Sequence, residues 1–115
     1  MSFSKGDVVL VPFPFTDLTQ TKLRPAIVLY AQSEGENITL CFISSQNLDC
    51  LSRDEFIIDV THPEFSNTGL KSGSKVKVSR IVTIDRTLIQ RKLGGLGVEL
   101  TADLNRILID ILLLS

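Results

Sequence analysis

Short apolar runs separated by polar turns occupy most of this chain before a last, longer apolar segment. Runs of this length, rich in Val, Ile and Phe and bounded by turn-forming residues, are typical of β-strands. The pattern predicts five or six strands, at residues 8–13, 25–32, 38–43, 56–60, 75–84 and 90–93. Residues 85–88 are expected to form one helical turn, and residues 62–73 a long irregular connection.

The fifth predicted strand carries an alternation that matters for function. Val76 and Val78 are expected to face the core, and Lys75, Lys77 and Ser79 to face outward, because successive side chains of a strand point to opposite faces. Outward lysines are ordinary on a solvated strand, and they are also the residues that contact phosphates. The pattern leaves both readings open.

The last apolar segment has helical spacing. Thr101 is expected to cap a helix over residues 102–114, and Asp103 suits the positive end of the helix dipole. The expected core-facing stripe consists of Leu104, Ile107, Leu108, Ile111 and Leu112. Ile109, Leu113 and Leu114 widen it beyond what one core-facing helix needs, which points to a partner chain such as a second copy. Many short strands followed by one helix predict a single domain over residues 1–115, mainly β, with a small, strongly bent sheet that closes towards a barrel.

Composition adds one asymmetry to this picture. The chain has 115 residues and a formal net charge of -1. Residues 71–92, however, hold seven basic residues against the single acid Asp85, which gives +6 there and leaves -7 for the remainder. Local positive charge is a weak indication of a polyanionic partner, since affinity for phosphates depends on local rather than total charge.

Other features of the sequence argue against several classes of protein. Two cysteines are too few for a disulfide scaffold, and Cys41 lies in an apolar run where a small buried thiol is expected. The N-terminus has no apolar signal segment, and Arg106 and Asp110 interrupt the longest apolar stretch, so we expect a cytoplasmic protein that does not cross a membrane. His62 is the only histidine, expected on an exposed turn, and no Cys/His/Asp group has metal-ligand spacing. The sequence therefore predicts no bound metal and no cofactor.

Candidate functional residues lie at the ends of two predicted strands. Arg24 precedes Pro25, which keeps Arg24 extended where a polar loop over residues 16–22 meets a rigid strand. Ser44, Ser45 and Gln46 directly follow the third apolar run. An arginine could simply end a strand in solvent, and serines are ordinary turn residues. The alternative is that the guanidinium of Arg24 and the serine hydroxyls are directed at a bound phosphate.

A set of motifs in order carries a family resemblance: Gly6-Asp7 before the first strand, Arg24-Pro25 before the second, Ser44-Ser45-Gln46 after the third, and SKVKVSRIVTIDRTLI over the fifth. Together they resemble the MazF/PemK/Kid family of toxin endoribonucleases of type II toxin–antitoxin systems. The resemblance implies an SH3-like β-barrel of the CcdB/PemK type with a C-terminal helix, acting as a homodimer. It implies metal-independent cleavage of single-stranded RNA, including mRNA, at specific sequences by attack of the 2'-hydroxyl on the adjacent phosphate, which inhibits translation and growth. It also implies a cognate antitoxin that covers the RNA groove.

The chain departs from the family pattern at two places. Thr19-Gln20-Thr21-Lys22 stands where many members carry a glycine and an acidic residue, so the preferred RNA sequence cannot be transferred. Serines stand where the family hydroxyl is often threonine, and either Ser44 or Ser45 can take that place.

Residue roles follow from the resemblance and from the demands of the reaction. Arg24 is the candidate for stabilising charge on the phosphorane, because its planar fork matches phosphate oxygens. Ser44 or Ser45 would orient the 2'-hydroxyl or bind a phosphate oxygen. The candidate RNA-binding residues are Thr16, Gln20, Lys22, Gln46, Lys75, Lys77 and Arg80. Gln46 could instead bond only to backbone, and Arg80 could be a surface ion-pair partner.

Two other functions remain open. CcdB-like toxins share the expected barrel but poison DNA gyrase by binding it, and they lack the Arg-Pro and Ser-Gln pairing seen here. An inactive relative that binds RNA or a partner without cutting is the second alternative, since the polar loop and the serines depart from the common pattern.

Overall fold

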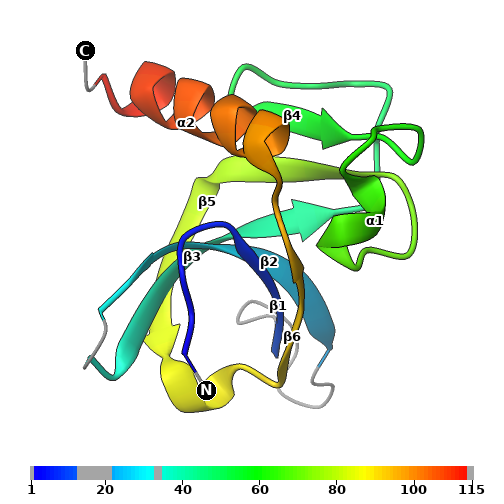
Figure 1. Cartoon of the computed structure of the whole chain (residues 1–115). Helices are drawn as coiled ribbons and strands as arrows, with labels where there is room; N and C mark the ends of the chain where they lie inside the picture. The colour runs from blue at the N-terminus through cyan, green and yellow to red at the C-terminus, as the bar shows by residue number, and fades with distance from the viewer. Residues whose placement is uncertain (1, 13–21, 33–34, 114–115) are drawn as a thin grey trace.

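The computed structural model describes residues 2–12, 22–32 and 35–113. It contains one six-stranded antiparallel sheet in the order β4-β5-β3-β2-β1-β6, and a C-terminal helix that crosses one end of the curled sheet (Figure 1). The elements are β1 (Asp7–Pro12), β2 (Leu23–Ala31), β3 (Asn37–Ser44), β4 (Glu55–Ile58), α1 (Phe65–Thr68), β5 (Ser74–Asp85), β6 (Arg91–Gly95) and α2 (Val98–Leu112). The predicted fold class, mainly β with a C-terminal helix, is confirmed.

All six predicted strands are present, with ends that differ by one or two residues. The turn predicted over residues 85–88 is a short 3-10 helix, Arg86–Leu88, whose first turn is capped by the Asp85 carboxylate accepting from the Thr87 amide. The connection over residues 62–73 is not wholly irregular, because it contains α1. No helix in the part of the chain described here has the length and hydrophobicity that a membrane crossing needs.

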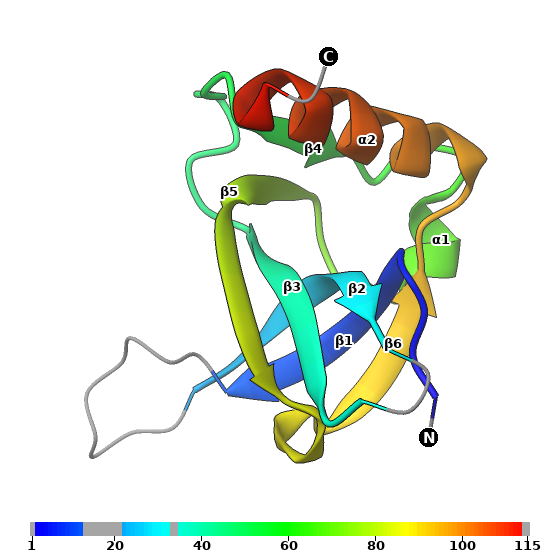
Figure 2. The same cartoon turned by 90° about the vertical axis from the view of Figure 1, so that its left-hand side faces the viewer.

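The strand β5 bends sharply in its middle (Figure 2). Along β3, the partner on β5 changes from Ile81 opposite Cys41 to Lys77 opposite Phe42, so residues 78–80 form a bulge. The half before the bulge pairs with both β3 and β4, whereas the half after it pairs with β3 alone. Bulges increase local bending and redirect side chains, and this one sets the positions of Lys77 and Arg80.

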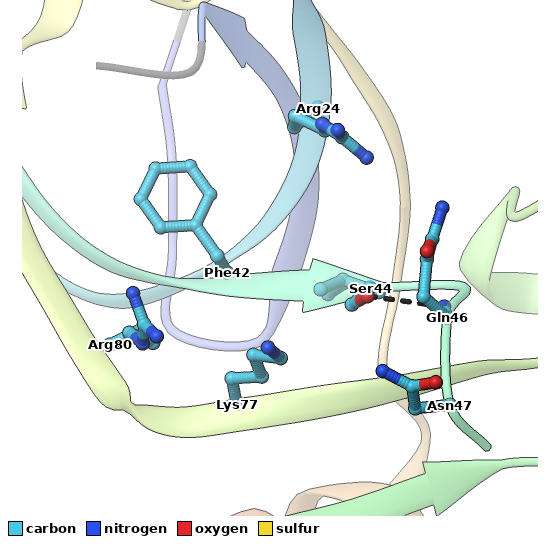
Figure 3. Close-up of a pocket in the computed structure, with 8 residues that line it drawn as sticks. Arg24, Phe42, Ser44, Gln46, Asn47, Lys77 and Arg80 are labelled. Atoms are coloured by element: carbon cyan, nitrogen blue, oxygen red, sulfur yellow. Dashed lines mark hydrogen bonds between the residues drawn. The ribbon is translucent and has the colours of Figure 1, made fainter. Parts of the chain in front are cut away.

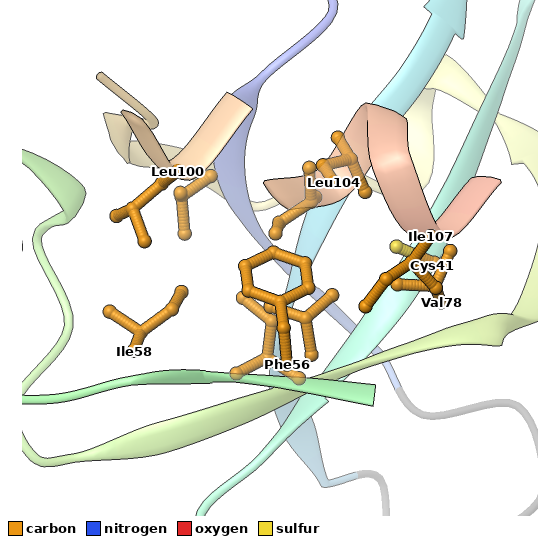
Figure 4. Close-up of a cluster of buried hydrophobic side chains, with 11 residues drawn as sticks. Cys41, Phe56, Ile58, Val78, Leu100, Leu104 and Ile107 are labelled. Atoms are coloured by element: carbon orange, nitrogen blue, oxygen red, sulfur yellow. The ribbon is translucent and has the colours of Figure 1, made fainter. Parts of the chain in front are cut away.

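Apolar side chains fill both faces of the central strands. On one face Cys41 and Ile43 join Phe56, Leu100 and Leu104 beneath α2 (Figure 4). On the other face Ile38, Leu40 and Phe42 join a second cluster with Val9, Val28 and Phe3. Period-2 alternation sends neighbouring β3 residues into different clusters, so apolar residues occur on both faces of β3. Burial raises the pKa of the Cys41 thiol to about 12, as expected for a packed, unreactive cysteine.

The start predicted for the C-terminal helix is wrong. α2 begins at Val98 with Gly97 in the N-cap position, so Thr101 lies inside the helix and does not cap it. The cap comes from Glu64, whose carboxylate oxygens accept from the amides of Glu99 (3.0 Å) and Leu100 (2.9 Å). These backbone hydrogen bonds lower the pKa of Glu64. A carboxylate from a distant segment thus satisfies donors that would otherwise be unpaired, and the helix gains a turn.

The apolar surface of α2 is wider than its core contact, as the sequence indicates. Leu104 and Ile107 are buried, and Leu108 and Ile111 pack partly against the same cluster. Leu112, expected in the core-facing stripe, is 48% exposed, and Ile109 and Leu113 are also exposed. Leu114 lies outside the described residues. The exposed patch Ile109, Leu112 and Leu113 is therefore left on the outside of the helix.

Candidate active site

Arg24 stands at the edge of a hollow of about 270 Å³, called the first hollow below (Figure 3). β2 holds Arg24 opposite Val11 of β1, and Pro25 follows in the same strand. The hollow is lined by Arg24, Phe42, Ile43, Ser44, Gln46, Asn47, Lys77 and Arg80. Three segments far apart in the sequence therefore meet here: β2, the end of β3 with the loop after it, and the bend of β5.

A tight turn directs the residues after β3 into the first hollow. Ser44 ends the strand, and its Oγ accepts from the Gln46 amide at 3.1 Å. Asn47 then adopts a positive φ of 53°, a conformation that asparagine tolerates better than most residues. Gln46 and Asn47 both line the hollow as a result. Asn47 was not predicted as a site residue, although an asparagine directly after Ser-Ser-Gln is a turn signal.

The chemistry of the first hollow suits an anion. Three of its lining residues are cations (Arg24, Lys77 and Arg80), and Ser44, Gln46 and Asn47 add hydroxyl and amide groups. Among the described residues that line it, none is a histidine, cysteine, aspartate or glutamate. Phe42, which is 5% exposed, adds little open surface. Cations together with hydroxyl and amide groups can contact the phosphates of a nucleic acid and hydrogen-bond its bases.

Ser45 lies on the other side of Arg24. It lines a second hollow of about 280 Å³, with Arg24, Pro25, Leu70, Lys71 and Arg91 among its other lining residues. Ser44 and Ser45 are neighbours at a strand end, so their side chains point to opposite sides. Ser44 shares a hollow with Gln46, Lys77 and Arg80, and Ser45 does not.

The prediction that Lys75 faces outward is wrong. The residue is 5% exposed, and its ammonium donates to the carbonyl oxygens of Asn47 (3.2 Å) and Cys50 (3.1 Å) and to Oε1 of Glu55 (3.1 Å). The neighbouring strand β4 and the loop between β3 and β4 cover this end of β5. The side of β5 that carries Lys75 is therefore not open to solvent. Lys75 holds the loop that carries Asn47 and lines neither hollow around Arg24.

The other candidate residues are distributed as follows. Lys22 is exposed just before β2 and is not among the residues that line either hollow. Thr16 and Gln20 lie outside the described residues. Their contact with RNA stays a prediction.

His62 is partly buried rather than exposed. Its Nδ1 accepts from the Glu64 amide at 3.0 Å, and its Nε2 lies 3.7 Å from Glu99 Oε2. Ligand atoms of His62, Glu64 and Glu99 lie within 4.8 Å of one another, a grouping that sequence spacing missed because Glu99 is distant along the chain. This group lies at the start of α2, where both Glu64 oxygens already accept backbone amides. It lines neither hollow.

Comparisons with known proteins agree with this architecture. The family model for PemK-like, MazF-like toxins of type II toxin–antitoxin systems matches residues 4–112. A comparison with curated protein sequences finds no match.

Three solved structures have a similar fold. An endoribonuclease in complex with its cognate antitoxin, from a mycobacterial species, has a TM-score of 0.75 at 11% identity, covering 99% of this chain and 98% of that one. The Mycobacterium tuberculosis toxin MazF-mt6 has a TM-score of 0.70 at 18% identity, with coverage of 90% and 93%. A chain of the MazE-MazF structure from Deinococcus radiodurans has a TM-score of 0.68 at 21% identity, with coverage of 94% of each chain. At these identities the likeness shows the fold alone, whereas the family match spans nearly the whole sequence. The chain belongs to the family of PemK-like, MazF-like toxins of type II toxin–antitoxin systems.

Proposed function

We propose that this toxin is an endoribonuclease that cuts single-stranded RNA at specific sequences, without a metal, and thereby inhibits translation and growth. The observation that carries the proposal is the first hollow, where Arg24, Ser44 and two further cations converge. Family membership and the similar endoribonuclease structure support the same reaction class.

Arg24 is proposed to stabilise the transition state. Attack of a 2'-hydroxyl on the adjacent phosphate adds negative charge to the phosphorane, and a guanidinium can meet two of its oxygens at once. An arginine is a poor proton donor because its pKa exceeds about 12. Its main contribution is therefore electrostatic, and protonation of the leaving 5'-oxygen is assigned to no residue of the first hollow.

Ser44 is the better candidate for the functional hydroxyl. It shares the first hollow with Arg24, Gln46, Lys77 and Arg80, so it can hydrogen-bond a 2'-hydroxyl or a phosphate oxygen of the group held by the arginine. It does not need to form a covalent bond with the substrate. Gln46, Lys77 and Arg80 would hold the RNA beside the reacting phosphate. Ser45, Thr16, Gln20 and Lys22 remain candidates for contacts further along the strand, with the loop over residues 16–22 contributing to sequence preference.

Two protein partners follow from family membership. An acidic antitoxin segment could cover the cationic first hollow by charge complementarity and fold on binding. A second copy of this chain could cover the exposed patch Ile109, Leu112 and Leu113 on α2, which would remove apolar surface from water.

The proposal is tested by incubating the purified protein with a long single-stranded RNA in EDTA. We expect cleavage that leaves 5'-hydroxyl ends. Arg24→Ala should reduce the rate about 100-fold or more, the usual cost of losing one transition-state stabiliser, with unchanged far-UV circular dichroism. Arg106→Ala, at an exposed arginine of α2, serves as the matched control and should cut normally.

Failure of the wild-type protein to cut any RNA in EDTA would contradict the proposal. That result would favour a non-catalytic toxin of the same fold, either one that poisons gyrase by binding it or one that binds RNA or a partner without cutting. Full activity in Arg24→Ala would instead contradict the assigned role of the arginine.

A further inference from the structure

The second hollow has properties that the reaction at Arg24 does not use. Its volume, about 280 Å³, matches that of the first hollow. Its apolar lining includes Pro25, Leu70 and Leu93, and the two cations at its exposed surface are Lys71 and Arg91. Apolar surface bordered by cations and hydroxyls is a combination that suits one nucleoside and its phosphate.

One wall of the second hollow is built to a fixed shape. Gly69 ends α1 with a φ of 74°, and a Cβ at this position would lie 2.1 Å from the Leu93 carbonyl oxygen. At Gly94 a Cβ would lie 2.3 Å from the Asn67 carbonyl oxygen. The segment that carries Leu70 and Lys71 therefore sits directly against β6, which carries Arg91 and Leu93. The hollow is preformed, as small-ligand sites usually are.

The two hollows adjoin at Arg24 and Ile43, which line both. Ser44 borders the first and Ser45 borders the second, on opposite sides of the same strand end. A phosphate held by Arg24 would thus have one hollow on the side of its 5' neighbour and the other on the side of its 3' neighbour. Consecutive nucleotides of a single strand have this relation to the phosphate that joins them.

We infer that the second hollow is a nucleotide subsite, which binds the nucleoside on one side of the phosphate held at Arg24 while the first hollow binds the nucleoside on the other side. This inference rests on the proposed function and adds specificity-determining residues to it. The base would lie against Leu70, Leu93 and the plane of the Arg91 guanidinium, and Ser45 and Ser72 would offer hydrogen bonds to its edge. Lys71 would contact the next backbone phosphate. RNA is favoured over an acidic peptide because Arg24, the proposed phosphate ligand, itself lines the second hollow.

The test measures binding and not cutting. A short single-stranded RNA is selected by binding to the wild-type protein from a random pool that is fully 2'-O-methylated, so that no member can be cleaved. Its bases are then removed one at a time, and the dissociation constant of each abasic version is measured for wild type, Arg91→Ala and Lys92→Ala. Lys92 is the matched control, since it is a neighbouring exposed cation that lines neither hollow.

We expect the wild-type protein to lose about fivefold to 100-fold in affinity when the base on either side of one phosphate is absent, as for the loss of one stacked base. Arg91→Ala should lose this sensitivity on one side and keep it on the other. Lys92→Ala should keep both. A filling variant, Ser72→Trp, should give the same one-sided loss and provides a second measurement if Arg91→Ala binds too weakly.

The inference would be overturned if Arg91→Ala and Ser72→Trp remained equally sensitive to base removal on both sides of the phosphate, or lost this sensitivity on both sides together. It would also be overturned if the wild type bound no RNA. A further contrary result would be an acidic peptide whose binding depends on Arg91 when RNA binding does not. Failure of the proposed function looks different. In that case unmodified RNA of the selected sequence is bound but not cut, and the abasic series still decides whether the second hollow holds a base.

Discussion

Lys75 and Arg24 are two cations in neighbouring parts of one sheet, and they have opposite surroundings. Lys75 is 5% exposed, and its three donor hydrogens can all be used by Asn47, Cys50 and Glu55. Arg24 is half-buried and lines two solvent-open hollows. One charge is directed inward and holds a loop, and the other is placed where a ligand can reach it.

The difference shows that a cluster of basic residues in a sequence does not predict which of them line a binding site in the fold. Lys75 belongs to the segment with a charge of +6, yet it does not line either hollow. Lys77, two residues later on the same strand, lines the first hollow. What separates the two lysines is the cover that β4 and the preceding loop give to the start of β5. Cover by neighbouring segments, rather than charge density, separates the lysine that holds a loop from the lysine that lines the hollow.

The largest expected effect comes from removing the inward charge. Lys75→Met should lower the free energy of unfolding by about 3–5 kcal/mol, because it leaves the carboxylate of Glu55 buried without its partner. Denaturant unfolding measures the loss. Lys77→Met, the same substitution two residues away, is the control and should change stability by less than about 0.5 kcal/mol. Equal losses in both variants would contradict the distinction between the two lysines.

The next effect distinguishes the two serines that flank Arg24. Ser44→Ala should slow RNA cleavage about 10-fold to 100-fold, since a hydrogen bond to a charged group contributes roughly 1.5–3 kcal/mol. Ser45→Ala removes the same hydroxyl from the second hollow and should change KM or base preference more than kcat. Single-turnover kinetics separate the two effects. A larger loss of kcat in Ser45→Ala would move the functional hydroxyl to the second hollow.

A smaller effect is expected for the outward cation of β5. Lys77→Met should weaken RNA binding about fivefold and reduce the dependence of log Kd on log salt by about one, as for the loss of one phosphate contact. The measurement is a salt titration of binding with an uncleavable RNA. Lys92→Met, at an exposed lysine outside both hollows, should leave the salt dependence unchanged.

The smallest effect concerns Glu64, an acidic residue whose carboxylate, like the Lys75 ammonium, is bound by backbone groups. Its pKa is lowered, chiefly by the backbone amides of Leu100 and Glu99, so the charged form is favoured in the folded state. The charged carboxylate therefore stabilises the folded protein fully at pH values above the ordinary pKa of 4.5. This stabilisation is lost as the pH falls through the lower pKa of the folded state. Glu64→Gln should lower the melting temperature at pH 7, and this difference from wild type should shrink below pH 4.5. Glu99→Gln is the control; a difference that stays constant with pH would contradict the assignment.

The parts that could be predicted from the sequence depend on neighbours along the chain. A short run of mainly apolar residues over positions 38–43 predicts β3, and Pro25 fixes the extended conformation of Arg24. The parts that could not be predicted depend on contacts between distant residues. Glu64 moves the start of α2, and β4 covers Lys75. The separation of Ser44 from Ser45 depends on residues distant in the sequence, because β5 residues line the hollow at Ser44 and β6 residues line the hollow at Ser45.

The most direct test of the central claim, that Arg24 stabilises attack by the 2'-hydroxyl, compares two oligonucleotides in EDTA. One is an RNA that the protein cuts, and the other differs only by a 2'-deoxyribose at the cleaved position. We expect the wild type to cut the first and not the second, and Arg24→Ala to cut the first about 100-fold more slowly or less at an unchanged melting temperature. Cleavage of the deoxy-substituted strand, or a wild-type rate in Arg24→Ala, would contradict the account.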